Sequence, residues 1–97
     1  MTLSEFKNSL LTSHPPKGMS SVLLALWHDA KGDWEASHNV AQDIDTKEGA
    51  WIHAYLHRKE GDIWNADYWY RNAGRKRPES TLEEEWNELV NKFIANK

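Results

Sequence analysis

The sequence predicts an all-α fold of about six helices in a single helical domain that spans residues 1–97. Three observations support this prediction. Apolar residues recur every three or four positions in several segments, which is the period of an amphipathic helix. Two Gly-Asp pairs separate neighbouring helical segments, and in each pair the glycine suits a helix end and the aspartate a helix start. No stretch alternates between polar and apolar residues for long enough to indicate a sheet.

Composition limits the class of protein. Hydrophobic residues make up 39% of the chain and charged residues 28%, which is typical of a globular domain with one core. The formal net charge of −3 disfavours nucleic acid as a partner, because phosphate recognition requires a basic surface. The absence of cysteine excludes disulfides and thiolate metal sites. No segment has the features of a signal peptide or reaches the roughly 18 apolar residues of a membrane span, so we expect a cytoplasmic protein without a membrane partner.

The first predicted helix covers residues 2–12. Thr2 and Glu5 have the spacing of a capping box, in which each side chain bonds the backbone N–H of the other residue. The sequence His14-Pro15-Pro16 ends the helix, because proline lacks the N–H that a helix interior needs. The apolar residues of this segment are expected on one face: Leu3, Phe6, Leu10 and Leu11.

Residues 20–44 are predicted to form a helical hairpin with helices at about 20–31 and 34–44. The first helix is apolar almost all round, which indicates packing on more than one side. Gly32 fits the left-handed position that ends a helix, and Asp33 fits the cap of the next one. Small residues on the inner stripe of the second helix permit close helix contact; the stripe consists of Trp34, Ser37, Ala41 and Ile44.

Residues 47–74 are predicted to form a second hairpin, with helices at 47–60 and 63–73. Its Gly61-Asp62 turn repeats the chemistry of Gly32-Asp33 at an offset of 29 residues. The same offset aligns four further pairs of residues: Ala25 with Ala54, His28 with His57, Ser37 with Ala66, and Gly49 with Pro78. Repetition over 20 to 50 residues indicates stacked helical units, whose ends require capping elements.

A C-terminal capping helix is predicted over residues 80–96. Ser80 and Glu83 have capping-box spacing, and the run Glu83-Glu84-Glu85 lies near the positive end of the helix dipole, while Lys92 and Lys97 lie near the negative end. One apolar stripe follows the helical period: Leu82, Trp86, Leu89, Val90, Phe93 and Ile94.

The spacing of small residues and glycines in residues 20–78 resembles the tetratricopeptide repeat. The second unit carries the resemblance through Ala54, Gly61, Ala66, Ala73 and Pro78, and the first through Ala25, Gly32 and Trp34. The offset of 29 residues is shorter than that family's usual period of about 34. The run from His53 to Arg71 is also similar to a family of small uncharacterised bacterial proteins, a similarity that implies no activity.

The resemblance implies that the first helix of each hairpin lines a concave groove. Trp51, Tyr55 and Arg58 would then point into the groove, together with Glu48 and Lys59. Tryptophan, tyrosine and arginine are the residue types that dominate binding interfaces, and arginine also grips carboxylates and phosphates. The leading prediction is therefore a non-enzymatic binding or adaptor module without a cofactor, whose groove recognises a protein, a peptide, a second copy of the chain or a small acidic ligand. The alternative for these aromatic residues is a place in the core.

Histidines supply the alternative function, a small-ligand or divalent-metal-binding enzyme. His53 and His57 lie four residues apart on one helix face, a spacing that can provide two zinc ligands, and Glu60 follows one turn later. His28, at the equivalent place in the first hairpin, is a candidate third ligand, and His38 is another candidate. The competing interpretation is that these rings pack between aromatic residues without a metal. Asp33 and Asp62 are explained by capping alone.

Overall fold

The computed structural model describes residues 1–95, and the regular secondary structure of this part of the chain is all helical. It contains six helices and no strand, which confirms the predicted fold class. The helices are α1 (Leu3–Ser9), α2 (Ser21–Ala30), α3 (Trp34–Gln42), α4 (Lys47–Glu60), α5 (Ile63–Asn72) and α6 (Leu82–Ala95). None of the described helices is long and apolar enough to cross a membrane.

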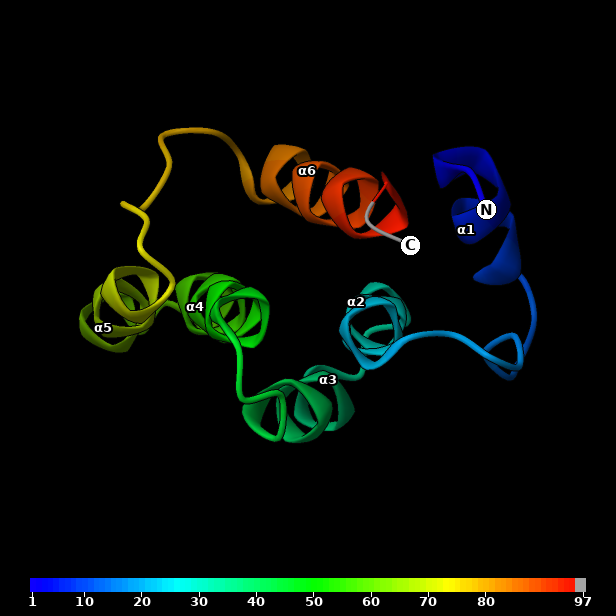
Figure 1. Ribbon diagram of the computed structural model, residues 1–97, viewed down its shortest axis with the longest axis horizontal. Coiled ribbons are helices and arrows are strands. Elements are labelled where there is room, and N and C mark those ends of the chain that lie inside the picture. Colours follow the sequence, from blue (N-terminus) through cyan, green and yellow to red (C-terminus); the bar gives the residue numbers. More distant parts are fainter. Residues whose placement is uncertain (96–97) are drawn as a thin grey trace.

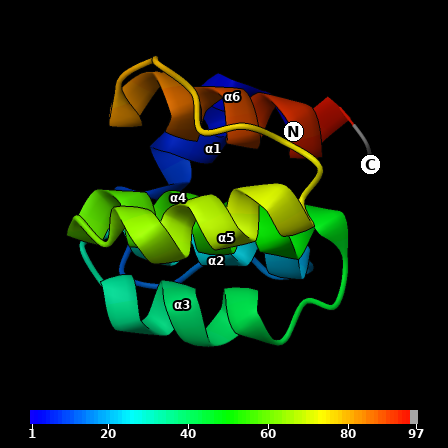
Figure 2. The ribbon, with the colours of Figure 1, turned by 90° about the vertical axis from the view of Figure 1, so that its left-hand side faces the viewer.

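Two helical hairpins form the body of the molecule. Helices α2 and α3 make the first and α4 and α5 the second, and α3 packs against α4 where the hairpins meet (Figure 1). Helix α6 lies over α2 and α4, with α1 beside it. Seen from the side, α6 and α1 form one layer, α2 and α4 the next, and α3 lies on the opposite side (Figure 2).

The turns inside the two hairpins have the same structure, as the repeated Gly-Asp pairs predict. Gly32 and Gly61 adopt positive φ angles of 84° and 90°, which a residue with a side chain rarely adopts. The side chains of Asp33 and Asp62 accept hydrogen bonds from backbone N–H groups in the first turns of α3 and α5. This local chemistry ends one helix and starts the next within two residues.

Small residues allow the two helices of each hairpin to approach closely. Ala25, Ser37, Ala54 and Ala66 are all completely buried. In the first hairpin the Ser37 hydroxyl donates a 2.6 Å hydrogen bond to the Ala25 carbonyl, so the buried hydroxyl has a partner. Of the predicted stripe, Ser37 and Ala41 are buried and Trp34 is partly buried, whereas Ile44 lies in the connector after α3.

The terminal helices differ from the prediction in their bounds. Helix α1 ends at Ser9 instead of residue 12, because the Ser9 and Thr12 hydroxyls bond backbone carbonyls and favour turns. Leu11 is consequently 86% exposed and does not share the buried face of Phe6. Helices α3 and α5 end at Gln42 and Asn72, one or two residues earlier than predicted.

The cap of helix α6 lies one residue later than predicted, at Thr81, and the helix begins at Leu82. The capping box is formed by Thr81 and Glu84, with bonds of 2.8 and 3.1 Å, and the predicted box of Ser80 and Glu83 is wrong. The backbone carbonyl of Ser80 instead accepts a hydrogen bond from Arg58. The predicted helix end at residue 96 and the terminal Lys97 lie outside the described residues.

The core lies where α6 covers α2 and α4. Trp86 of α6 donates its indole N–H to the Leu26 carbonyl at 3.2 Å, and its ring lies 5.7 Å from the ring of Phe6, the only buried residue of α1. The largest completely buried apolar side chains include Leu23, Leu26, Ile52, Leu56, Leu89 and Val90.

Candidate functional site

The aromatic residues of α4 are part of the core. Trp51 is 3% exposed and Tyr55 is 2% exposed, and the Arg58 side chain is largely buried as well. The predicted open groove with these three residues exposed is therefore wrong. Its physical reason is the position of α6, which packs on the face of α4 that would have lined the groove.

The polar atoms of Trp51 and Arg58 bind a buried carboxylate. Glu85 of α6 is completely buried and accepts hydrogen bonds from Trp51 Nε1 at 3.1 Å and from the Tyr70 hydroxyl at 2.6 Å. The guanidinium of Arg58 forms an ion pair with it at 2.7 Å. The sequence pattern missed this role, because Glu85 stands in an acidic run at a helix start. The carboxylate that Arg58 of α4 binds is therefore a side chain of the same protein and not an external acidic ligand.

A second buried carboxylate joins α2 to α4. Asp29 accepts a 2.9 Å hydrogen bond from the Tyr55 hydroxyl and pairs with Lys59 at 2.8 Å. Burial is the main reason why the pKa of Tyr55 lies far above its usual value, and the nearby Asp29 carboxylate raises it further. The pKa of Tyr70 is raised in the same way by burial and by Glu85. Both phenols therefore keep the protons that they donate to the carboxylates. These contacts join α2 to α4 and α4 and α5 to α6.

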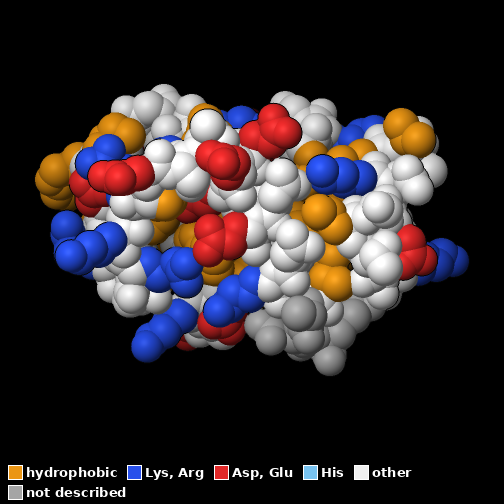
Figure 3. Space-filling view, turned by 90° about the horizontal axis from the view of Figure 1, so that it is seen from above, with side chains coloured by type: hydrophobic (Ala, Val, Ile, Leu, Met, Phe, Trp, Pro, Cys, Tyr) orange, Lys and Arg blue, Asp and Glu red, His pale blue; other side chains and the backbone are white. Residues whose placement is uncertain are grey.

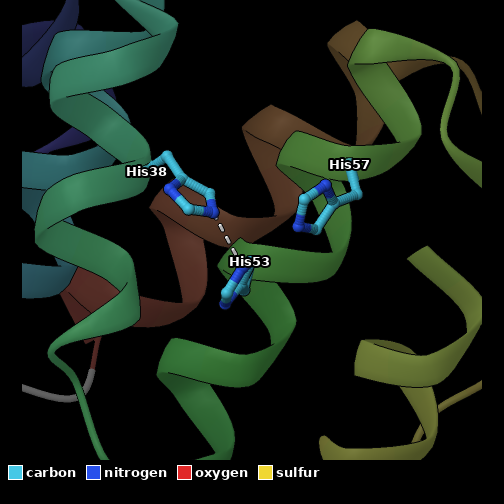
Figure 4. A group of neighbouring side chains, drawn as sticks. All are labelled: His38, His53 and His57. Carbon is cyan, nitrogen blue, oxygen red and sulfur yellow. Dashed lines mark hydrogen bonds between the residues drawn. The ribbon is translucent and has the colours of Figure 1, made fainter. Parts of the chain in front are cut away.

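Three histidines meet between α3 and α4. His38 of α3 faces His53 and His57 of α4, and one ring nitrogen of each lies within 4.8 Å of the others (Figure 4). His38 Nε2 and His53 Nε2 are 2.9 Å apart, the distance of a hydrogen bond between two neutral rings. The pair that spacing predicts on α4 is thus completed by His38. His28 lies in the last turn of α2 with its ring edge-on to Trp27 and, among the described residues, belongs to no such group.

Two tryptophans fix the planes of the histidine rings. Trp34 stacks on His38 with ring centroids 4.9 Å apart, and Trp69 of α5 stacks on His53 at 4.1 Å. Trp34 is itself held by a 2.9 Å hydrogen bond from its indole N–H to the Leu56 carbonyl. The cluster is consequently built by three helices, and its rings are oriented before any ligand arrives.

A carboxylate orients the third histidine. His57 Nδ1 lies 2.6 Å from Glu60 Oε2, one turn further along α4. When Nδ1 carries the hydrogen of this bond, the lone pair of His57 is on Nε2. A carboxylate behind an imidazole is the arrangement that supports metal-ligating histidines in many proteins.

The surroundings of His38 and His53 keep these two rings neutral. Burial has the largest effect, and together with the neighbouring His38 and His57 it lowers the pKa of His53 to about 4. Burial and His57 also lower the pKa of His38, against an opposing effect of Glu60. Near pH 7 both rings are therefore uncharged, and a neutral imidazole is the form that donates a lone pair to a metal.

An open cleft lies beside His53. It has a volume of about 530 Å³, and its walls include His53, Trp69 and the connector between α3 and α4. A cleft of this volume accommodates a small molecule. Asp45, Thr46 and Asn72 add polar groups to the wall. Of the three histidines only His53 lines the cleft, and its exposed fraction is 7%.

Comparison with known protein families, with curated proteins and with solved structures found no match to this chain.

Proposed function

We propose that the protein binds a divalent transition-metal ion through His38, His53 and His57. The observation that supports this is the meeting of three histidines from two helices, with candidate ligand nitrogens within 4.8 Å of one another. Zinc binds imidazole nitrogens at about 2.0–2.1 Å, so two such nitrogens in a tetrahedral site lie roughly 3.3 Å apart. The 2.9 Å between His38 Nε2 and His53 Nε2 is close to that spacing. Small side-chain rotations would bring the third nitrogen into place.

The donor set favours zinc, nickel or copper over magnesium or calcium. Imidazole nitrogens suit the former metals, and the latter prefer oxygen ligands. Three protein ligands are typical of catalytic zinc sites, where a fourth position holds water or substrate. In this proposal the fourth ligand enters through the cleft lined by His53 and Trp69. Metal-assisted chemistry on a small molecule is therefore the reaction class that the site would support.

An adaptor function, the leading expectation from sequence, has less support. It needs a surface other than the α4 face, where Trp51 and Arg58 bind Glu85 of α6 and the buried Tyr55 binds Asp29 of α2. The repeated Gly-Asp turns and the buried small residues support a tetratricopeptide-like character of the hairpins. We also propose that the protein is cytoplasmic, as the sequence predicts.

Zinc titration of matched histidine variants tests the metal site. Protein purified without added metal is freed of ions with a chelator and titrated with zinc in a calorimeter. We expect one equivalent to bind to the wild type and the His57→Gln variant to bind at least about 100-fold more weakly, because one of three ligands is lost. His28→Gln removes a histidine outside the cluster and serves as the control with unchanged affinity.

The carboxylate behind His57 gives a finer test of the same site. Glu60→Gln should weaken zinc binding by about 10- to 100-fold while the helical circular dichroism stays unchanged. Equal zinc affinity in the wild type and His57→Gln, or weak binding at several sites in both proteins, would contradict the proposal.

A further inference from the structure

A second hollow lies on another side of the second hairpin. It has a volume of about 610 Å³ and is bordered by α4, α5 and the loop that joins α5 to α6. Five of its lining residues carry positive charge: Arg58, Arg71, Arg75, Lys76 and Arg77. Two lining residues are acidic, Asp67 and Glu79. A cationic hollow is unexpected in a chain whose formal net charge is −3.

The space-filling view shows this asymmetry. Lys and Arg side chains gather on the left-hand part of the face in Figure 3. This is the end of the molecule where Figure 1 places α5 and the loop that follows it. No residue of this hollow belongs to the histidine cluster, so the two sites can be tested separately.

Two of the arginines are held in place by buried partners. Arg75 lies over the ring of Trp51, with its guanidinium carbon 3.5 Å from the ring centroid. Arg58 is fixed by its ion pair with Glu85 and by a hydrogen bond to the Ser80 carbonyl. Arginines fixed in this way lose little further freedom when they bind a ligand, which reduces the cost of association.

The remaining cations are available to a ligand. Arg77 pairs with Asp67 at 3.0 Å, but both side chains are substantially exposed, and exposed pairs of this kind are weak. Arg71 and Lys76 are exposed and have no hydrogen bond or ion pair through their side chains within residues 1–95. Unpaired cations beside fixed arginines form a site for negative charge.

We propose that this hollow binds a small molecule that carries at least two anionic groups, either phosphates or carboxylates. Arginine binds both groups through paired N–H donors, and lysine adds a mobile point charge. The volume lies within the range of about 300–1,000 Å³ that small-molecule sites occupy. One anionic group of the ligand would bind the fixed Arg58 and Arg75, and another would bind the exposed Arg71 and Lys76.

Two small polyanions test the site, one that carries phosphate groups and one that carries carboxylates. Pyrophosphate and citrate are titrated into the full chain in a calorimeter, and the preferred probe identifies phosphate or carboxylate as the recognised group. We expect saturable binding of one equivalent of at least one probe, weakened about tenfold or more in the double variant Arg71→Gln/Lys76→Gln. Both substitutions fall on exposed side chains, so the fold should be retained.

The control variant Lys7→Gln/Lys17→Gln makes the same change in net charge on exposed residues of α1 and the loop after it, at the opposite end of the molecule (Figure 1). Its affinity should equal that of the wild type. Equal weakening in both double variants would reveal a general charge effect and overturn the proposal. Failure of both probes to saturate would also overturn it, as would binding of polyglutamate in place of either small anion.

Discussion

Glu85 is a charged residue at a position that water does not reach. Its carboxylate is compensated by the Arg58 guanidinium and by hydrogen bonds from Trp51 and Tyr70. A buried charge is tolerated only with such compensation, because its desolvation costs several kcal/mol. Trp51 and Arg58, which the sequence pattern places on an exposed binding surface, are therefore required to hold this carboxylate.

Replacing Glu85 with glutamine should be strongly destabilising. The amide keeps the shape of the side chain but leaves the Arg58 charge without its counter-ion, and we expect the free energy of unfolding to fall by about 3 kcal/mol. Urea denaturation followed by tryptophan fluorescence measures this change. Glu88→Gln is the control, because Glu88 forms an exposed pair with Arg75 that should contribute less than about 1 kcal/mol. Equal effects of the two substitutions would show that the buried pair adds no stability.

The start of α4 depends on one close contact with the preceding connector. Gly49 lies in the first turn of α4, and a Cβ atom there would be 2.3 Å from the backbone oxygen of Ile44. The glycine is thus required by space, since its φ angle is not positive. The same connector forms part of the cleft wall beside His53.

Gly49→Ala should destabilise the protein although alanine is the better helix former. The helix propensity of alanine favours the substitution by about 1 kcal/mol, but overpacking against backbone costs about 1–3 kcal/mol, so we expect a net loss of stability. Thermal unfolding followed by circular dichroism measures the balance. Glu48→Ala changes an exposed side chain in the same turn and should shift the midpoint only slightly. A higher midpoint for Gly49→Ala would mean that the connector moves freely away from α4.

Local chemistry explains why most elements could be predicted from sequence. The Gly-Asp turns and the Thr2 cap depend on neighbouring residues only. The start of α6 could not be predicted in the same way, because Ser80 and Thr81 each stand three residues before a glutamate. Arg58, which is remote in sequence, donates a hydrogen bond to the backbone carbonyl of Ser80, and the Thr81 side chain caps the helix instead.

The candidate site was only half predictable for a geometric reason. Spacing along one helix identifies His53 and His57, because residues four apart share a face. His28 is the counterpart of His57 in the repeat, but equivalent residues in successive repeats are separated by the stacking of the units. His38 lies on the second helix of the first hairpin, which packs on the first helix of the next. Its partners follow from tertiary packing and not from the repeat.

At the scale of the whole molecule, α6 completes both hairpins. It packs on α1, α2 and α4 and contributes four buried apolar residues, Trp86, Leu89, Val90 and Phe93. In stacked helical repeats each unit has a face that a neighbour must cover. Here the C-terminal helix α6 covers the face that α2 and α4 share, so no further repeat is needed to bury it.

Removing α6 should therefore unfold the domain, whereas removing α1 should not. A chain that ends at residue 79 exposes Trp51 and Tyr55 and leaves Arg58 without Glu85, so we expect no cooperative thermal transition and strong binding of a hydrophobic dye. A chain that begins at residue 13 loses one buried side chain, Phe6, and should keep a cooperative transition at a lower temperature. Circular dichroism and dye fluorescence measure both variants. A cooperative transition at the wild-type temperature in the chain without α6 would mean that the two hairpins fold independently, and the face of α4 would then again be a candidate groove.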